Sequence, residues 1–227
     1  MINDDKVLHI QKNNLKLLDS SAYTFKPIYA LYFGTPAEAM VYNQLLYRAM
    51  TSNHKESEQN YVRFSYTRLA KMFGYSRKWI IETIKKLAAK GAIEVITTGR
   101  VNKIVFIEIE LNIQETQRNT AKMLVFPELL NKFGLLESIA LQQIHIRHCK
   151  KDEKFWVVRS YANWQEEVFM FLSISTVKRL FTKLESKNLI LKKKYENEFG
   201  VTNSYRVNYQ GLASLLGISL DKGNKGW

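Results

Sequence analysis

The sequence predicts an α+β fold, mainly α, in which one unit of about 80–90 residues occurs twice. In two stretches a capping serine precedes apolar residues at helical spacing. These stretches are "SRKWIIETIKKLAAKGAIEV" (76–95) and "LSISTVKRLFTKLESKNLIL" (172–191). Two upstream blocks recur in the same order: "SYTRL" (65–69) with "SYANW" (160–164), and "FGTPAEAMVYNQLL" (33–46) with "FGLLESIALQQIHI" (133–146). Because chance similarity between basic helices would not preserve that order, we interpret the chain as an internal duplication.

The first copy can be followed element by element. A capping box at Thr35–Glu38, with proline at the first helical position, predicts a helix that runs to about Met50. A polar loop then leads to a short strand at 61–65 and to a short helix that Gly74 ends. The long helix begins at Ser76 and ends at the glycine of "AAKGA". Apolar and polar residues alternate on both sides of "TGRVN", which predicts a β-hairpin.

The second copy repeats this order. Its first helix is expected near 136–148, "WVVRS" is its strand, "YANWQEEV" is its short helix and 173–187 is its long helix, before a hairpin with a longer turn. Two helices joined by a tight turn and followed by a hairpin are typical of a winged helix-turn-helix, whose second helix lies in the major groove of DNA. The predicted organisation is an N-terminal extension (1–32), a first winged-helix domain (33–110), a linker (111–123), a second winged-helix domain (124–212) and a C-terminal tail (213–227).

The composition favours a nucleic-acid partner. Lys and Arg number 34 against 21 Asp and Glu, a formal net charge of +13, and both halves of the chain are basic. This excess favours nucleic acid over an anionic membrane surface, since no segment has the pattern of a basic amphipathic anchor. The single cysteine excludes an intramolecular disulfide framework, and no apolar run reaches the roughly 20 residues of a membrane span. The polar N-terminus is unlike a secretory signal, so we expect a cytoplasmic protein with no membrane partner.

The sequence contains no motif that carries catalysis. It has neither a phosphate-binding glycine loop nor a nucleophile elbow, and we interpret Glu166 and Glu167 as solvated surface. His145 and Cys149 share a helix face, but no fourth ligand is evident, and His145 in "LQQIH" fits a helix core. We therefore expect a non-enzymatic protein with no cofactor and no bound metal.

Three blocks of the second copy carry a resemblance to a known family. "FPELLNKFGLLESIALQQIH", "KFWVVRSYANWQEEV" and "SISTVKRLFTKLESKNLI" resemble the N-terminal winged-helix domain of replication initiator proteins from phages, plasmids and mobile elements of low-GC Gram-positive bacteria. The resemblance covers roughly 124–212, and the first copy shares the pattern more loosely. It implies a sequence-specific double-stranded DNA-binding protein that binds repeated origin sites and bends or opens AT-rich DNA for helicase loading, with host replication proteins as further partners.

Two other functions fit the same residues. A transcriptional regulator that binds operator DNA would use the same surfaces. A protein-interaction module that bridges partners without reading DNA is the alternative from a different class. The sequence also leaves open whether the chain forms a homodimer.

The residues expected to contact DNA lie opposite the buried stripes of the two long helices and on the hairpins that follow. In the second copy they are Ser175, Thr176, Arg179, Thr182, Lys183, Lys192, Lys193 and Lys194. In the first copy they are Arg77, Lys78, Trp79, Lys85, Lys86, Arg100 and Lys103. Arg179 could fork onto a guanine edge. Trp79 could stack on a sugar or a thymine methyl, or pack on a neighbouring domain or subunit, and the sequence leaves open whether both copies contact DNA.

Overall fold

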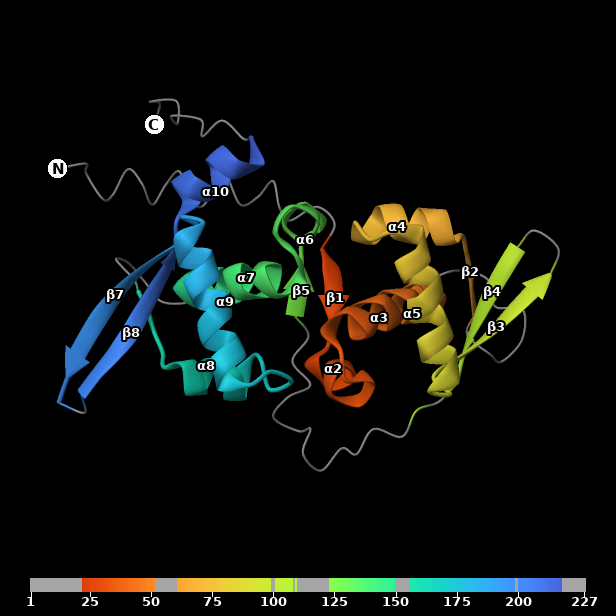
Figure 1. Ribbon diagram of the computed structural model, residues 1–227, viewed down its shortest axis with the longest axis horizontal. Coiled ribbons are helices and arrows are strands. Elements are labelled where there is room, and N and C mark those ends of the chain that lie inside the picture. The colour runs from red at the N-terminus through yellow and green to blue at the C-terminus, as the bar shows by residue number, and fades with distance from the viewer. Residues whose placement is uncertain are drawn as a thin grey trace. The chain divides into compact units, whose positions relative to one another are not determined.

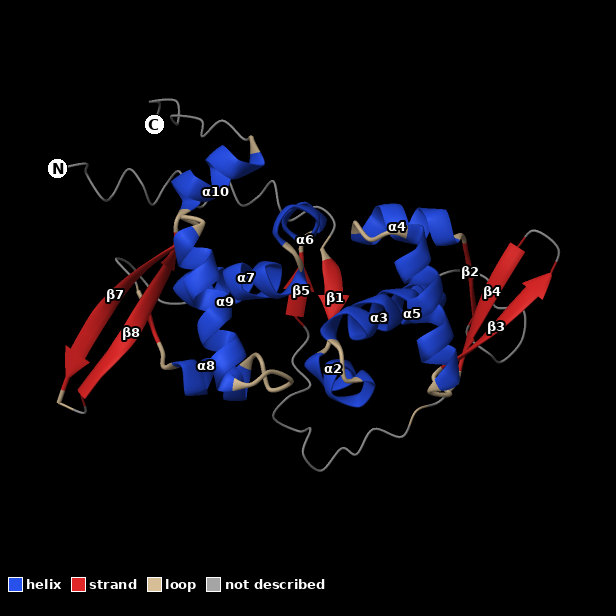
Figure 2. Cartoon of the chain, viewed as in Figure 1, coloured by secondary structure: helices blue, strands red, loops and turns tan. Residues whose placement is uncertain are grey.

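A computed structural model of the chain describes residues 22–51, 61–98, 101–107, 109, 123–149, 156–198 and 200–217. Over these residues the protein is α+β, with nine helices and small antiparallel sheets (Figure 1, Figure 2). The chain divides into two compact units: Tyr23–Asn131 forms one, and the described residues from Lys132 onward belong to the other. The predicted α+β class, with helices predominating, is confirmed.

The unit Tyr23–Asn131 places a long helix directly before a hairpin. Its elements in chain order are β1 (Tyr23–Phe25), α2 (Pro27–Phe33), α3 (Pro36–Thr51), β2 (Tyr61–Phe64), α4 (Tyr66–Phe73), α5 (Arg77–Ala89), β3 (Ile93–Thr98), β4 (Val101–Phe106), β5 (Met123–Val125) and the start of α6 (Pro127–Phe133). The strands β2, β4 and β3 form an antiparallel sheet with β4 in the centre. β3 and β4 are the hairpin predicted around "TGRVN".

Local signals explain where α5 begins and ends. Ser76 has extended backbone, and its Oγ accepts a hydrogen bond from the amide of Trp79 at 3.1 Å, as an N-cap serine does. Gly91 has a φ of 69°, a left-handed conformation that glycine adopts without steric cost and that ends the helix. The apolar stripe between these ends faces the core, since Ile80, Ile84 and Leu87 are all buried.

The second unit has a similar long helix and hairpin. α6 crosses the boundary between the two units, and the elements that follow are α7 (Leu135–Cys149), β6 (Val157–Val158), α8 (Tyr161–Glu167), α9 (Ile174–Ser186), β7 (Ile190–Asn197), β8 (Gly200–Val207) and α10 (Tyr209–Leu216). The strands β6, β8 and β7 form an antiparallel sheet with β8 in the centre. α9 packs against α8, α7 and β7.

An aromatic cluster holds α9 in the second unit. The ring centroid of Phe181 in α9 lies 4.7 Å from that of Tyr205 in β8 and 5.2 Å from that of Trp164 in α8. All three side chains are buried. Aromatic pairs at such distances each contribute about 0.5–1.5 kcal/mol beyond their area burial. After α9, Asn188 takes a φ of 57°, a left-handed conformation that asparagine tolerates better than most residues with a side chain.

The same order of elements occurs twice along the chain. The first series is β1, α2, α3, β2, α4, α5, β3 and β4. The second series has helices and strands in the same order, and it consists of β5, α6, α7, β6, α8, α9, β7 and β8. The sheet orders β2-β4-β3 and β6-β8-β7 also correspond. α10 follows the second series.

The first unit begins earlier than the predicted domain boundary at residue 33. β1 and α2 both lie in the segment predicted as an N-terminal extension (1–32). α2 packs on α3, where the ring centroids of Tyr29 and Phe33 each lie 4.9 Å from that of Tyr42. β1 pairs with β5, and Thr24 lies opposite Leu124. A three-residue strand whose partner lies so far along the chain has no periodic pattern to reveal it. At the other end, α10 continues past the predicted domain end at residue 212.

Candidate nucleic-acid interface

The first turn of α9 presents several hydroxyl groups and one guanidinium. Ser173 caps the helix, and its Oγ accepts a hydrogen bond from the amide of Thr176 at 3.3 Å. The same Oγ lies 2.9 Å from Ser175 Oγ and 2.9 Å from Thr176 Oγ1. Arg179, less than one turn further on, is exposed and donates from Nη2 to Thr176 Oγ1 at 3.2 Å. The buried stripe on the opposite side consists of Val177, Leu180, Phe181 and Leu184.

The chemistry of this turn suits a polar target such as a base edge or a phosphate. The guanidinium is a rigid fork of donors, and each hydroxyl beside it both donates and accepts. The turn also lies at the N-terminal end of α9, where the helix macrodipole favours a negative charge. Thr182, one turn further along the same face, is exposed as well. The structure therefore brings together Ser175, Thr176, Arg179 and Thr182 as the sequence predicted, on one exposed surface.

The lysines of the β7–β8 hairpin have different partners. Lys192 Nζ lies 2.7 Å from the Glu185 carboxylate, and this hydrogen bond raises the pKa of Lys192. Lys193 Nζ lies 4.4 Å from the ring centroid of Trp156, a cation–π contact. Lys194 is exposed. Within the described residues, Lys192 is therefore the one lysine of the three that pairs with a carboxylate.

Lys86 and Lys183 each meet a buried carboxylate at the start of another helix. Lys183 Nζ forms an ion pair with Glu137 in the first turn of α7. Lys86 Nζ lies 3.8 Å from Glu38 in the first turn of α3, and Lys90 Nζ lies closer to the same carboxylate at 2.7 Å. The lysine side chains stay largely exposed while both glutamates are buried. Lys86 and Lys183 were predicted to contact DNA. In the structure Lys86 links α5 to α3, and Lys183 links α9 to α7.

The exposed face of α5 carries four cations and a half-buried tryptophan. The cations are Arg77, Lys78, Lys85 and Lys86, the last of which lies near Glu38. The ring of Trp79 stacks on that of Tyr75, with 4.1 Å between centroids, so it has a packing partner in the turn that precedes its own helix. On the hairpin, Lys103 Nζ lies 4.9 Å from the ring centroid of Tyr61. Arg100 lies outside the described residues.

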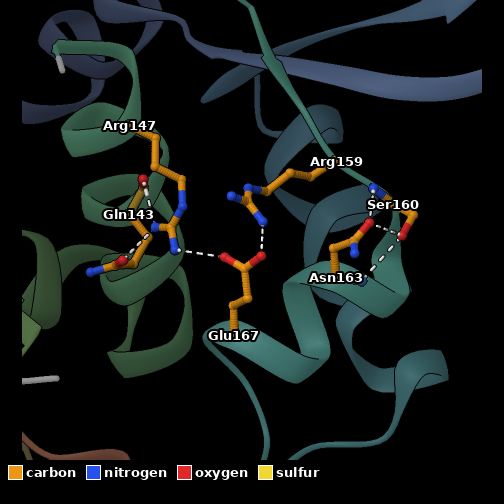
Figure 3. A network of polar contacts seen from close by, with 6 residues as sticks. All are labelled: Gln143, Arg147, Arg159, Ser160, Asn163 and Glu167. Carbon is orange, nitrogen blue, oxygen red and sulfur yellow. Dashed lines mark hydrogen bonds and ion pairs between the residues drawn. The ribbon is translucent and has the colours of Figure 1, made fainter. Parts of the chain in front are cut away.

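A polar network that the sequence did not reveal joins α7 to α8 (Figure 3). The Glu167 carboxylate forms ion pairs with Arg159 and with Arg147, whose Nη2 lies 3.5 Å away. Arg147 also donates to the side-chain oxygen of Gln143 at 2.5 Å. Burial lowers the pKa of Arg147, as does the nearby Arg159, while Glu167 raises it. Glu167 is exposed, in agreement with its interpretation as solvated surface, but its ion pairs were not predicted. Arg147 comes from α7, Arg159 from the segment after β6 and Glu167 from α8. No periodic pattern in the sequence connects these three positions, and the tertiary fold brings their charges together.

The described part of the chain contains no group of three or more His, Cys, Asp or Glu side chains placed to hold a metal ion. His145 instead has its Nδ1 2.7 Å from the hydroxyl of Tyr209, and the side chain of Cys149 lies outside the described residues. Among the described helices, none combines the length and the apolar character that crossing a membrane requires.

No family model, curated protein or solved structure matches the chain.

Proposed function

We propose that the chain is a non-enzymatic, sequence-specific double-stranded DNA-binding protein, built from two winged-helix domains that arose by internal duplication. The observation that carries this proposal is the first turn of α9, where Ser175, Thr176 and Arg179 lie together on an exposed surface. A short helix precedes that turn, and a basic hairpin follows α9. In a winged helix-turn-helix of this kind, the second helix lies in the major groove with its first residues at the base edges. The repeated order of elements and the equivalent sheet orders support the duplication.

In the proposed mechanism, α9 enters the major groove with its first turn at the base edges. Arg179 exchanges its hydrogen bond to Thr176 for a bidentate contact with the O6 and N7 atoms of a guanine. Lys193 and Lys194 on the hairpin contact backbone phosphates, which position the protein and make the affinity depend on salt. α5 acts as a second reading helix through Arg77 and Lys78.

The proposed biological role is replication initiation for a plasmid, phage or other mobile element. The protein would bind repeated origin sites in the cytoplasm and open AT-rich DNA, to which host replication proteins are recruited. Support comes from the resemblance of the three blocks in the second copy and from the net charge of +13, which suits a DNA partner. A transcriptional regulator would use the same surfaces on an operator.

Genome-wide mapping of bound sites tests this role. Wild type, Arg179→Ala and a control, Lys187→Gln, would be crosslinked to DNA in cells and the bound fragments sequenced. Lys187 is exposed at the end of α9 and lies outside the proposed interface. We expect wild type and control to occupy tandem repeats at one origin, and Arg179→Ala to lose them. Occupancy of promoter palindromes would assign the protein to transcription, and the absence of any recurrent site would favour the protein-interaction module.

A further inference from the structure

Three arginines of the first unit line one pocket. The pocket has a volume of about 310 Å³ and lies where Arg48 near the end of α3, Arg63 of β2 and Arg68 of α4 meet. Its apolar wall includes Leu45, Val62 and Leu69. β2 is an outer strand of its sheet. The volume is at the lower end of the range typical of small-molecule sites.

The described residues provide no carboxylate partner for these three arginines. None of the three takes part in an ion pair within the described chain, where Arg48 Nη2 instead contacts the sulfur of Met72 at 2.9 Å, a weak acceptor. Burial and the charge of Arg68 both lower the pKa of Arg48. Arg63 lies directly opposite Lys103 on β4, and like charges in that arrangement are destabilising. The pocket thus concentrates positive charge whose mutual repulsion a bound anion would relieve.

The start of α4 adds a second reason to expect an anion. Ser65, the N-cap residue of α4, lines the pocket but makes no capping hydrogen bond through its side chain. The first turn of α4 contains no acidic residue and does contain Arg68, a cation at the helix end where the macrodipole disfavours positive charge. Helix N-termini with unsatisfied amides are favourable positions for phosphate groups.

At the corresponding place in the second unit, the protein itself provides a carboxylate for the arginines (Figure 3). There the N-cap residue Ser160 forms a capping box with Asn163, and Glu167 forms ion pairs with two arginines. Glu167 is the seventh residue after Ser160, and the seventh residue after Ser65 is Met72. Within the described residues, the second unit therefore provides a side-chain capping hydrogen bond and a carboxylate at this place, and the first unit provides neither.

We propose that the pocket of Arg48, Arg63 and Arg68 binds a phosphate group. Guanidinium groups hold phosphate through paired hydrogen bonds, and three of them around one pocket, beside an uncapped helix start, supply more donors than a single chloride or carboxylate uses. The phosphate can come from a DNA backbone, in which case the inference rests on the proposed function, or from a small soluble phosphate compound. The two sources share the same chemistry and are separated by the test.

The test uses the full-length protein in four forms. Arg63→Gln/Arg68→Gln removes two exposed guanidiniums, and Met72→Glu introduces the carboxylate that the second unit has at this place. Lys132→Gln/Lys187→Gln is a control that removes two exposed positive charges elsewhere. Inorganic phosphate is titrated at constant ionic strength, with chloride as the balancing anion, while arginine Nε–H resonances and the Tm are followed. Circular dichroism checks that each variant is folded.

Wild type and control should show saturable shifts and a rise in Tm with phosphate. Both responses should vanish in Arg63→Gln/Arg68→Gln and in Met72→Glu, and Met72→Glu should have a higher Tm than wild type without phosphate. Saturable phosphate binding that persists in folded Met72→Glu and in the double arginine variant would overturn the site, as would no saturable response in wild type.

The salt dependence of duplex DNA binding then identifies the source. The slope of log K against log salt is compared between the double arginine variant and the control. If the slope is smaller by about 0.9 in the double arginine variant, the bound group is a backbone phosphate. An unchanged slope, with loss of the phosphate response, identifies a small phosphate compound and leaves the site standing. Because the phosphate titration contains no DNA, it stays informative even when wild type does not bind DNA, a result that would refute only the proposed function.

Discussion

Replacing Arg179 by alanine should change DNA recognition while leaving the fold nearly intact. The side chain is exposed, and its contact in the unbound protein is the 3.2 Å hydrogen bond to Thr176 at the surface. Surface substitutions of this kind usually change the free energy of unfolding by less than about 0.5 kcal/mol. We therefore expect the thermal unfolding curve of Arg179→Ala to lie close to that of wild type.

The expected effect on recognition is much larger. A bidentate arginine–guanine pair contributes about 1–3 kcal/mol of discrimination, which corresponds to about 5- to 150-fold in affinity. Arg179→Ala should lose that much affinity for the preferred duplex and should tolerate any base at one position. Its affinity for unrelated duplexes should fall far less, because phosphate contacts supply most non-specific binding.

Fluorescence anisotropy at fixed salt would measure both effects. Wild type, Arg179→Ala and the control Lys187→Gln are titrated with the preferred duplex and with duplexes that replace each guanine in turn. Equal weakening on every sequence would mean that Arg179 contacts only phosphate, which refutes the base-reading role. Binding identical to wild type would remove α9 from the interface and transfer the reading role to Arg77 and Lys78 of α5.

Three further outcomes follow from the described contacts. Changing Lys192–Lys194 to alanine should reduce the slope of log K against log salt by about 1.8. This value corresponds to two phosphate contacts, because Lys192 already has Glu185 as a partner. An unchanged slope would exclude the hairpin from the interface. Ser160→Ala should lower the free energy of unfolding by about 1 kcal/mol in denaturant titrations, and Ser65→Ala by clearly less, since of these two serines only Ser160 makes a capping hydrogen bond through its side chain. Equal losses would contradict the assignment of the caps. Burial raises the pKa of Tyr42, so the folded state keeps a proton that the unfolded state releases above about pH 10, and stability should fall as pH rises past that value. Tyr42→Phe should reduce the fall in Tm between pH 9 and 11, and a fall as steep as that of wild type would assign it to other groups.

Much of the local structure could be predicted from the sequence because the signals are short-range. Ser76 and Ser173 cap α5 and α9 as expected, and a left-handed Gly91 follows the first of these helices. The apolar stripe of α9 is buried, which leaves Ser175 and Arg179 exposed on the opposite face. Helical periodicity and caps involve neighbours within a few residues, so one sequence is enough to place them.

The features that escaped prediction all depend on tertiary contacts. β1 pairs with β5 far along the chain, which moves the start of the first unit back to Tyr23. The carboxylate partners of Lys86 and Lys183 come from other helices, so the sequence could show these lysines only as a basic face. The same reason hides the pocket of Arg48, Arg63 and Arg68, whose members come from two helices and a strand. Charges that meet only in the folded chain leave no periodic pattern.

Selection of bound duplexes from a random pool would show whether the protein binds DNA in a sequence-specific way. Wild-type protein would be incubated with the pool at fixed, near-physiological salt, and bound sequences would be recovered and sequenced over several rounds. We expect enrichment of one recurrent motif that contains a guanine, and loss of that guanine preference when Arg179→Ala is selected in parallel. A pool that stays as diverse as the input after several rounds with folded wild-type protein would contradict sequence-specific DNA binding.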